Sequence, residues 1–250
     1  MSAQDLGLLV LAGVGAGAVG SGAGLASLVS FPALLAFGLP PLTANVTNTV
    51  ALTMSSLGSV ASSQPELKGK GRLLARYCAA AVVGGAAGAV LLLSLPAESF
   101  EKVVPWLVAL AAVSLLARPW LRRWMKERIH GEHRGVTVGL GIIAVYGGYF
   151  GAAAGVLMLA LLAAAVDESF ARVNAVKNTV LGAANATAAV IFLAVGPVDL
   201  AAAVPLGVGC LAGAAVAPPI VRRLPERPVR IVIGVSGLLL AVQLAVDAYR

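Results

Sequence analysis

Charged residues are scarce in this sequence. Only 12% of its 250 residues are Asp, Glu, Lys or Arg, whereas 59% are hydrophobic. A typical soluble domain is roughly 25% charged, so the composition excludes an ordinary soluble protein. The mean hydropathy of +0.93 and a series of long apolar runs instead indicate a multi-pass membrane protein, with the lipid bilayer as its first partner.

Acidic side chains are absent from the middle of every apolar run. Carboxylates at membrane depth mark proton relays and cation pathways, so their absence disfavours cation transport and metal chemistry inside the membrane. The 11 acidic residues lie in predicted loops or at the ends of runs: Asp5, Glu66, Glu98, Glu101, Glu127, Glu132, Asp167, Glu168, Asp199, Glu226 and Asp247.

Cysteine and aromatic residues are also few. Cys78 and Cys210 lie in apolar runs, without a CxxC spacing or a nearby histidine, so we predict no metal site, no disulfide framework and no cofactor. Aromatic residues make up 5% of the chain, and the net charge of +7 comes from basic residues in short loops. Both features argue against nucleic acid as a partner. Residues 1–5 lack a basic segment, which disfavours a cleaved signal peptide.

A glycine cluster interrupts the first apolar run, residues 6–37. As one helix this run would be about 48 Å long, whereas a bilayer core is about 30 Å thick. The cluster Gly20-Ser21-Gly22-Ala23-Gly24 permits a turn, so we predict two short helices, 6–19 and 25–37, that meet inside the membrane. The alternative is one long tilted helix with glycines at a packing face. Broken backbone at this depth must be buried or line a cavity, which makes the tip a candidate site.

The second half of the chain repeats the first. Short apolar pieces at 135–150 and 151–166 again flank glycines, and Asn48-Thr49-Val50 matches Asn178-Thr179-Val180 at a nearly constant offset. Small residues at four-residue spacing also match: Ala80, Gly84 and Gly88 with Gly209, Gly213 and Ala217. Such ladders predict close helix crossings. Internal duplication is typical of secondary transporters.

The predicted fold is an all-α integral membrane protein with two inverted repeats. Each repeat is a broken helix or short helical hairpin followed by three transmembrane helices. Residues 1–117 form the first repeat and 135–250 the second, and a basic cytoplasmic linker, 118–134, joins them. The remaining spans are predicted at 42–63, 73–95, 103–117, 170–195, 200–221 and 229–246.

Basic loops predict the orientation. They lie at 68–72, at 118–134 and at 222–227, and basic loops are enriched on the cytoplasmic side. With a hairpin at the start of each half, all three loops lie inside, the halves are inverted and both termini face outward. A single long helix at each start would place 222–227 outside, so the charge pattern favours the broken helix.

Polar side chains form a stripe on the span that follows each glycine break. Hydrogen bonding between helices explains many such groups, at about 0.6–2 kcal/mol per contact, and we assign the serines and Thr53 to that class. The repeated pair Asn48 and Asn178 is equally compatible with substrate contact. The stripe residues that we predict to bind substrate are Asn45, Asn48 and Thr49 in the first half and Asn174, Lys177, Asn178 and Asn185 in the second.

Lys177 breaks the duplication, because the first half has Thr47 at the matching position. One interpretation is a lysine that snorkels to the cytoplasmic surface. The other is a cation that holds an anionic substrate in a cavity. Helix N-termini at the two glycine tips would add partial positive charge there, so the predicted anion site also includes Gly22, Gly24, Gly151 and Gly155.

These motifs together resemble the sulfite exporter TauE/SafE family of bacterial membrane proteins over nearly the whole chain. In the first half the resemblance rests on residues 20–24, Phe31-Pro32, Gly38-Leu39-Pro40 and 44–49. In the second half it rests on 172–178, Asn185 and 222–225. The family is described as two modules of three transmembrane helices. Membership implies transport, often export, of sulfite or organosulfonates across the bacterial plasma membrane. The glycine triplet of the family reads Gly22-Ala23-Gly24 here, a departure that concerns the substrate more than the fold.

The expected function is therefore a secondary transporter of small anions that works by alternating access between the repeats. A membrane-embedded enzyme such as a lipid-pyrophosphate phosphatase is the alternative from another class. It would need acid–base groups near the tips, where the sequence has glycine, alanine, Ser21 and Tyr149. A non-transporting partner of a membrane complex is a third possibility. The sequence leaves the substrate, the direction, the coupling ion and the oligomeric state open.

Overall fold

The computed structural model describes residues 3–117, 120, 124, 133–166, 168–221 and 226–249, and its regular elements are helices. Within these residues, five helices are long and apolar enough to cross a membrane: α1, α5, α6, α10 and α12. The helices of the described residues are α1 (Ala3–Ala23), α2 (Ser27–Ala36), α3 (Pro41–Ser62), α4 (Gln64–Leu67), α5 (Gly71–Ser94), α6 (Ala97–Leu116), α8 (His133–Tyr149), α9 (Ala154–Ala165), α10 (Phe170–Val195), α11 (Leu200–Val221) and α12 (Glu226–Tyr249).

Both predicted helix breaks are present, so the alternative of one long tilted helix is wrong. The chain turns after α1 at Gly24, with φ of +75°, and after α8 at Gly151, with φ of +78°. Ala153 also has a positive φ, 61°, directly before α9. Such angles favour glycine, which explains why the chain breaks here.

The first helix is longer than predicted. α1 continues through Gly20 and Gly22 to Ala23 and has 21 residues, about 31 Å. Glycine costs only about 1 kcal/mol in a helix, and packing on α11 outweighs that cost here. Two other starts also differ from the prediction. α6 begins at Ala97, directly after Pro96, and α8 begins at His133, so the last residues of the predicted linker are helical.

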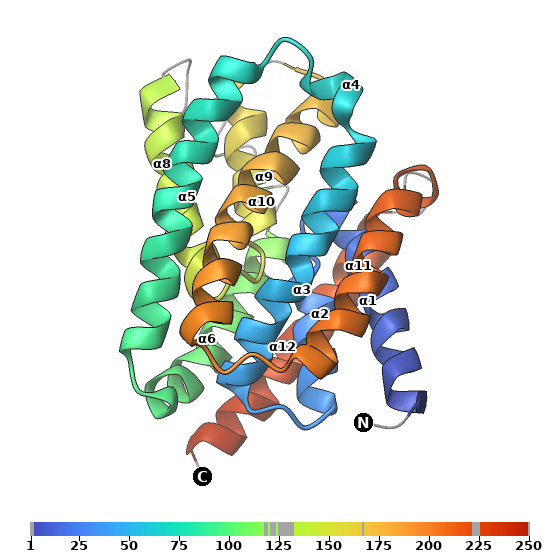
Figure 1. Cartoon of the computed structure of the whole chain (residues 1–250), viewed down its shortest axis with the longest axis vertical. Coiled ribbons are helices and arrows are strands. Elements are labelled where there is room, and N and C mark those ends of the chain that lie inside the picture. Colours follow the sequence, from blue (N-terminus) through green and yellow to red (C-terminus); the bar gives the residue numbers. More distant parts are fainter. Residues whose placement is uncertain are drawn as a thin grey trace.

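The helices form one bundle with two distinct ends (Figure 1). We call them the terminal end, where α1 starts and α12 finishes, and the α4 end. The loops that precede α5 and α10 meet at the α4 end, where Lys70 pairs with Glu168. At the terminal end, the Asp199 N–H donates to the Thr47 hydroxyl at 3.0 Å, which joins the start of α11 to that of α3. α3 and α10 therefore run in opposite directions through the centre.

Helices of the first half pack against helices of the second half. α1 packs against α11, and α8 packs against α5, while α3 pairs with α10 and α6 with α12. A Cβ at Gly84 would lie 2.4 Å from the Gly141 carbonyl oxygen, and one at Gly213 would lie 2.1 Å from that of Val14. The predicted close crossings at both ladders are thus confirmed, because only glycine lets these backbones approach.

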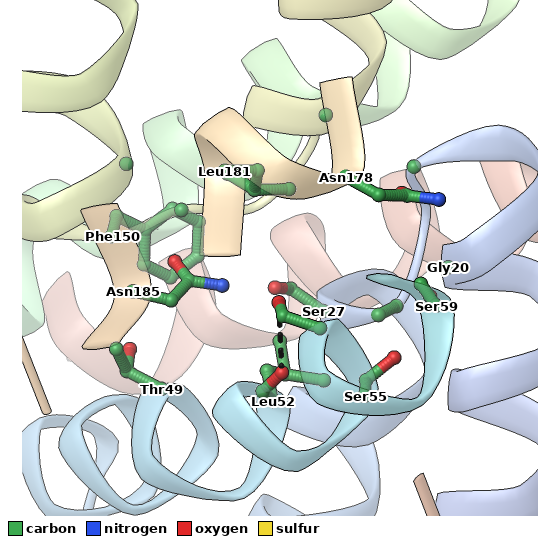
Figure 2. A pocket seen from close by; sticks show the side chains of 16 residues that line it. Gly20, Ser27, Thr49, Leu52, Ser55, Ser59, Phe150, Asn178, Leu181 and Asn185 are labelled. Atoms are coloured by element: carbon green, nitrogen blue, oxygen red, sulfur yellow. Dashed lines mark hydrogen bonds between the residues drawn. The ribbon is translucent and has the colours of Figure 1, made fainter. Parts of the chain in front are cut away.

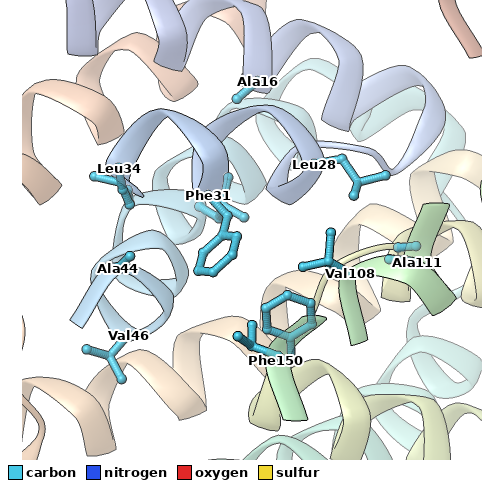
Figure 3. Packing of buried hydrophobic residues seen from close by; sticks show 14 of the residues in the cluster. Ala16, Leu28, Phe31, Leu34, Ala44, Val46, Val108, Ala111 and Phe150 are labelled. Atoms are coloured by element: carbon cyan, nitrogen blue, oxygen red, sulfur yellow. The ribbon is translucent and has the colours of Figure 1, made fainter. Parts of the chain in front are cut away.

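An aromatic cluster fills the space between α2, α6 and the break after α8 (Figure 3). The rings of Phe31 and Phe150 meet edge to face, with centroids 5.3 Å apart. Phe100 packs 6.1 Å from Phe150 and 5.9 Å from Tyr149. Edge-to-face pairs of this kind add about 0.5–1.5 kcal/mol to simple burial. The cluster therefore anchors the second glycine break against the first hairpin.

Candidate functional site

The two glycine breaks touch each other in the middle of the bundle. A Cβ placed on Gly24 would lie 2.6 Å from the carbonyl carbon of Gly155, and one on Gly155 would lie 2.8 Å from the Cα of Gly24. Contacts this short do not occur, so only glycine at both positions allows the hairpins to meet. The two breaks, one from each half, therefore pack directly against each other.

A cavity lies beside this contact, between α3 and α10 (Figure 2). It comprises about 540 Å³ of space between atoms, including the part that is open to the outside. Thr49, Ser55 and Ser59 of α3 face Asn178 and Asn185 of α10 across it. Both halves supply its lining: Gly20, Gly24, Ala26, Ser27, Thr49, Leu52, Ser55, Ser56, Ser59, Gly147, Phe150, Gly151, Gly155, Asn178, Leu181 and Asn185.

Six of the residues predicted from the sequence line this cavity: Thr49, Asn178, Asn185, Gly24, Gly151 and Gly155. Among them, Asn185 is only 7% exposed. Its amide makes no hydrogen bond with any described residue, so its donors and its acceptor are available to a ligand. Asn178 also donates to protein, as described next.

Lys177 lies behind the first hairpin rather than in the cavity wall. It is fully buried, so the snorkelling interpretation is wrong. Its ammonium donates to the carbonyl oxygen of Gly20 at 3.2 Å. Asn174 and Asn178 donate to the carbonyl oxygen of Ser21 at 2.8 and 3.2 Å. These carbonyls belong to the last turn of α1, which carries about half a negative charge; that of Gly20 also accepts from the Gly24 N–H at 2.9 Å.

Asn45 plays the corresponding role at the second break. Its Nδ2 donates to the carbonyl oxygen of Tyr149, the last residue of α8, at 2.9 Å. Asn48 instead accepts a hydrogen bond from the Ser30 hydroxyl and ties α3 to α2. Gly22 stays within α1. The structure thus brings these predicted residues next to the cavity without making them part of its lining.

Several cavity residues were missed by the sequence reasoning. Ser27 follows the first break directly, and Ser55, Ser56 and Ser59 continue the face of Thr49 on α3. The serines were assigned to helix packing, and Ser56 does donate to the Leu52 carbonyl at 3.3 Å. The three serines of α3 follow Thr49 by six, seven and ten residues, about two and three helical turns, and this helical spacing was the available signal. Nothing local marked hydrophobic members of the lining such as Leu52, Phe150 and Leu181.

Two helices begin at the breaks and direct their N-termini toward the cavity. α2 starts at Ser27 and α9 at Ala154, next to the lining residues Ala26 and Gly155. The first N–H groups of a helix lack helical partners and carry partial positive charge, which suits an anion. The C-terminal carbonyls at the same breaks are already bonded by Lys177 and the asparagines. The arrangement therefore favours anions over cations inside the cavity.

Charged groups of the site lie outside the cavity. No acidic or basic side chain is among its described lining residues. No group of three His, Cys, Asp or Glu able to hold a metal ion exists in the described part of the chain. At the α4 end, Glu168 bonds to Lys70 and, at 3.4 Å, to Arg172. The hydrogen bond from Lys70 holds the pKa of Glu168 below its usual value.

Comparison of the chain with known protein families agrees with these motifs. The family model "Sulfite exporter TauE/SafE" matches residues 9–244, which confirms the resemblance seen in the sequence. No curated protein and no solved structure matches the chain.

Proposed function

The chain belongs to the sulfite exporter TauE/SafE family, and from this premise we propose that it is a secondary transporter of sulfite or an organosulfonate in the plasma membrane of a bacterium. The members of this family are membrane transporters, not enzymes, which removes the phosphatase alternative. Alternating access between the two halves is the proposed mechanism, with the substrate bound in the cavity between α3 and α10.

One observation carries this proposal, the make-up of the cavity. Two helix N-termini, one from each half, lie at the cavity, and neutral hydrogen-bond donors line it. Sulfite and sulfonates carry negative charge on three oxygens, so they need several donors at once. Backbone N–H groups at Ser27 and Gly155, hydroxyls such as Thr49, and the amides of Asn178 and Asn185 supply donors of this kind. Neutral donors bind an anion without holding it so firmly that release becomes slow.

Lys177 is proposed to act on the anion through α1. The negative end of the α1 dipole lies close to the cavity, because Gly20 both lines it and accepts a hydrogen bond from Lys177. Uncompensated, this end would repel an anion. The buried ammonium, with Asn174, compensates it, and the N-terminus of α2 then dominates the local field.

The two halves, 1–117 and 135–250, are proposed to be inverted repeats. Support comes from the opposite directions of α3 and α10 and from the exchanged packing of α1 on α11 and of α8 on α5. Lys68, Lys70, Arg72 and Arg172 lie near the α4 end, which we assign to the cytoplasm because basic loops are enriched there. The basic side chains Arg222, Arg223, Arg227 and Arg230 lie outside the described residues.

Cysteine labelling tests this topology. In a chain with Cys78 replaced by serine, a cysteine at exposed Glu98 lies at the terminal end and one at exposed Lys68 lies at the α4 end. A membrane-impermeant thiol reagent should label position 98 in intact cells and position 68 only after permeabilisation. Labelling of both positions from outside would contradict the inverted arrangement.

Thermal stabilisation by a panel of anions tests the substrate site. A ligand that binds only the folded state raises stability by mass action, so sulfite or an organosulfonate should raise the Tm, whereas chloride at equal ionic strength should not. In Asn185→Ala the affinity should fall about 10- to 100-fold, since a hydrogen bond to a charged group contributes about 1.5–3 kcal/mol. Ser94→Ala, on an exposed hydroxyl of α5, is the matched control. Equal shifts in both variants would place the site elsewhere.

A further inference from the structure

The two helix ends at the breaks differ in charge. At the C-terminus of α1, three side-chain donors meet two backbone carbonyls, and one of the donors is the ammonium of Lys177. At the C-terminus of α8, the described side chain that meets the last carbonyl is Asn45, which is neutral. Both ends carry partial negative charge from their helices. Among the described residues, the α1 end thus has its own cation, Lys177, and the α8 end has none.

Asn45 also has an acceptor without a partner. The residue is 1% exposed, and its Oδ1 makes no hydrogen bond. Its Nδ2 is held by the Tyr149 carbonyl, so the amide cannot turn around without losing that bond. Buried acceptors are nearly always satisfied in folded proteins. The Tyr149 carbonyl, which accepts that bond, keeps a second lone pair. Together with the Asn45 Oδ1 atom it offers neutral oxygen ligands, which suit a positively charged partner.

We propose that the C-terminus of α8 and the Oδ1 atom of Asn45 bind a small monovalent cation of the alkali series, and that this cation is the coupling ion of transport. The inference rests on the proposed function, because coupling presupposes an anion substrate. The bound cation takes at α8 the place that the Lys177 ammonium holds at α1. Interrupted helices of secondary transporters offer cations this kind of C-terminal end.

The ligand chemistry selects charge and class. The groups named here are amide and peptide oxygens, which are hard ligands and prefer hard cations over zinc or copper. Divalent calcium sites recruit carboxylates, and no acidic residue lies on α3 or α8. A cation with a single positive charge is therefore the best match for the partial negative charge at this end of α8. The absence of intramembrane carboxylates, which disfavoured cation transport as the main function, is compatible with a cation bound by neutral oxygens.

The proposed cation site lies one helical turn from the cavity. Asn45 lies one turn before Thr49, whose hydroxyl donates to the Asn45 carbonyl at 3.1 Å, and Thr49 lines the cavity. On the other side, Gly147 and Gly151 of the same break are also lining residues. A cation here adds positive charge next to the anion, so each should strengthen the binding of the other by the same factor.

The first experiment compares the Tm of the purified full-length chain in NaCl, LiCl, KCl and choline chloride at equal ionic strength. At least one alkali cation should raise the Tm over choline. At ten times its Kd, a bound ion increases the folded-to-unfolded ratio about 11-fold. Asn45→Ala should lose this shift. Asn174→Ala, which removes the corresponding amide at the α1 end, should lower the Tm and keep the shift.

Asn45→Asp covers the case in which Asn45→Ala does not fold. The carboxylate keeps an oxygen ligand and adds charge, so the Tm of this variant should depend more strongly on the alkali cation than that of the wild type. Equal melting of the wild type in all four salts would overturn the proposal. So would an unchanged alkali shift in Asn45→Ala.

Transport separates this inference from the proposed function. In proteoliposomes, an inward gradient of the stabilising cation should drive accumulation of radiolabelled sulfite, and the same gradient of choline should not. Saturable sulfite exchange that is equal in all four salts would contradict the cation site and leave the anion transporter intact. Absence of sulfite flux in every salt would contradict the transporter itself.

Discussion

Substitution of Gly24 by alanine tests the contact between the two hairpins. At Gly24 the added methyl group meets two obstacles. The backbone has φ of +75°, and the new Cβ would lie 2.6 Å from the carbonyl carbon of Gly155. The neighbour is backbone, so it cannot rotate away as a flexible side chain would. We therefore expect both the hairpin contact and the helix break to be strained.

Two matched variants separate the obstacles. Gly38 has φ of +83° with open space around it, so Gly38→Ala meets only the conformational cost, roughly 1–2 kcal/mol. Gly155→Ala meets only the clash, 2.8 Å from the Cα of Gly24, and overpacking costs roughly 1–3 kcal/mol. Gly24→Ala should combine both and cost roughly 2–5 kcal/mol.

The assay is thermal unfolding in detergent, followed by tryptophan fluorescence, alongside sulfite flux. At about 2–4 °C per kcal/mol, the Tm should fall least for Gly38→Ala and most for Gly24→Ala. Flux should survive in Gly38→Ala and be lost in Gly24→Ala. If Gly24→Ala and Gly38→Ala melted at the same temperature, the hairpins would not touch as described.

Three further outcomes follow from the structure. Gly84→Leu and Gly213→Leu should both lower the Tm through clashes at the helix crossings, whereas Gly7→Leu, with no atom within 4 Å, should melt like the parent. Lys177→Ala should lose transport and also stability, because it removes a buried hydrogen bond to the Gly20 carbonyl and the cation beside the C-terminus of α1, and Lys177→Arg should retain part of both. Glu168 has a pKa lowered from 4.5 by its hydrogen bond to a lysine, so its contribution to stability is complete above about pH 4.5 and is lost as the pH falls through the lowered pKa. Glu168→Gln should therefore melt with less acid dependence in that window, and equal acid dependence would show that the bond contributes nothing.

Much of the fold was predictable because its signals are local. The bounds of α10 and α11 agree with the apolar runs at 170–195 and 200–221, since run length against bilayer thickness determines a span. Ser169 caps α10 by accepting from the Arg172 N–H, as its residue type indicates. The small-residue ladders also predicted the crossings, because a close approach requires small side chains on one helix face.

The exact position of the break and the role of Lys177 could not be predicted from local sequence signals. Several glycines could have ended α1, and the contact with Gly155 in the other half selects Gly24. The sequence placed Lys177 on a polar stripe, but its ammonium donates to a backbone carbonyl from the other half. Backbone carbonyls have no sequence signature. A long-range contact of this kind is visible only once the halves are packed.

Uptake of radiolabelled sulfite into proteoliposomes that contain only the purified chain is the most direct test of an anion site between the hairpins. An anion site between the hairpins predicts saturable uptake, with which organosulfonates compete and which Asn185→Ala shifts to higher substrate concentration. Uptake no faster than in protein-free liposomes, with sulfite and with every sulfonate tried, would contradict it.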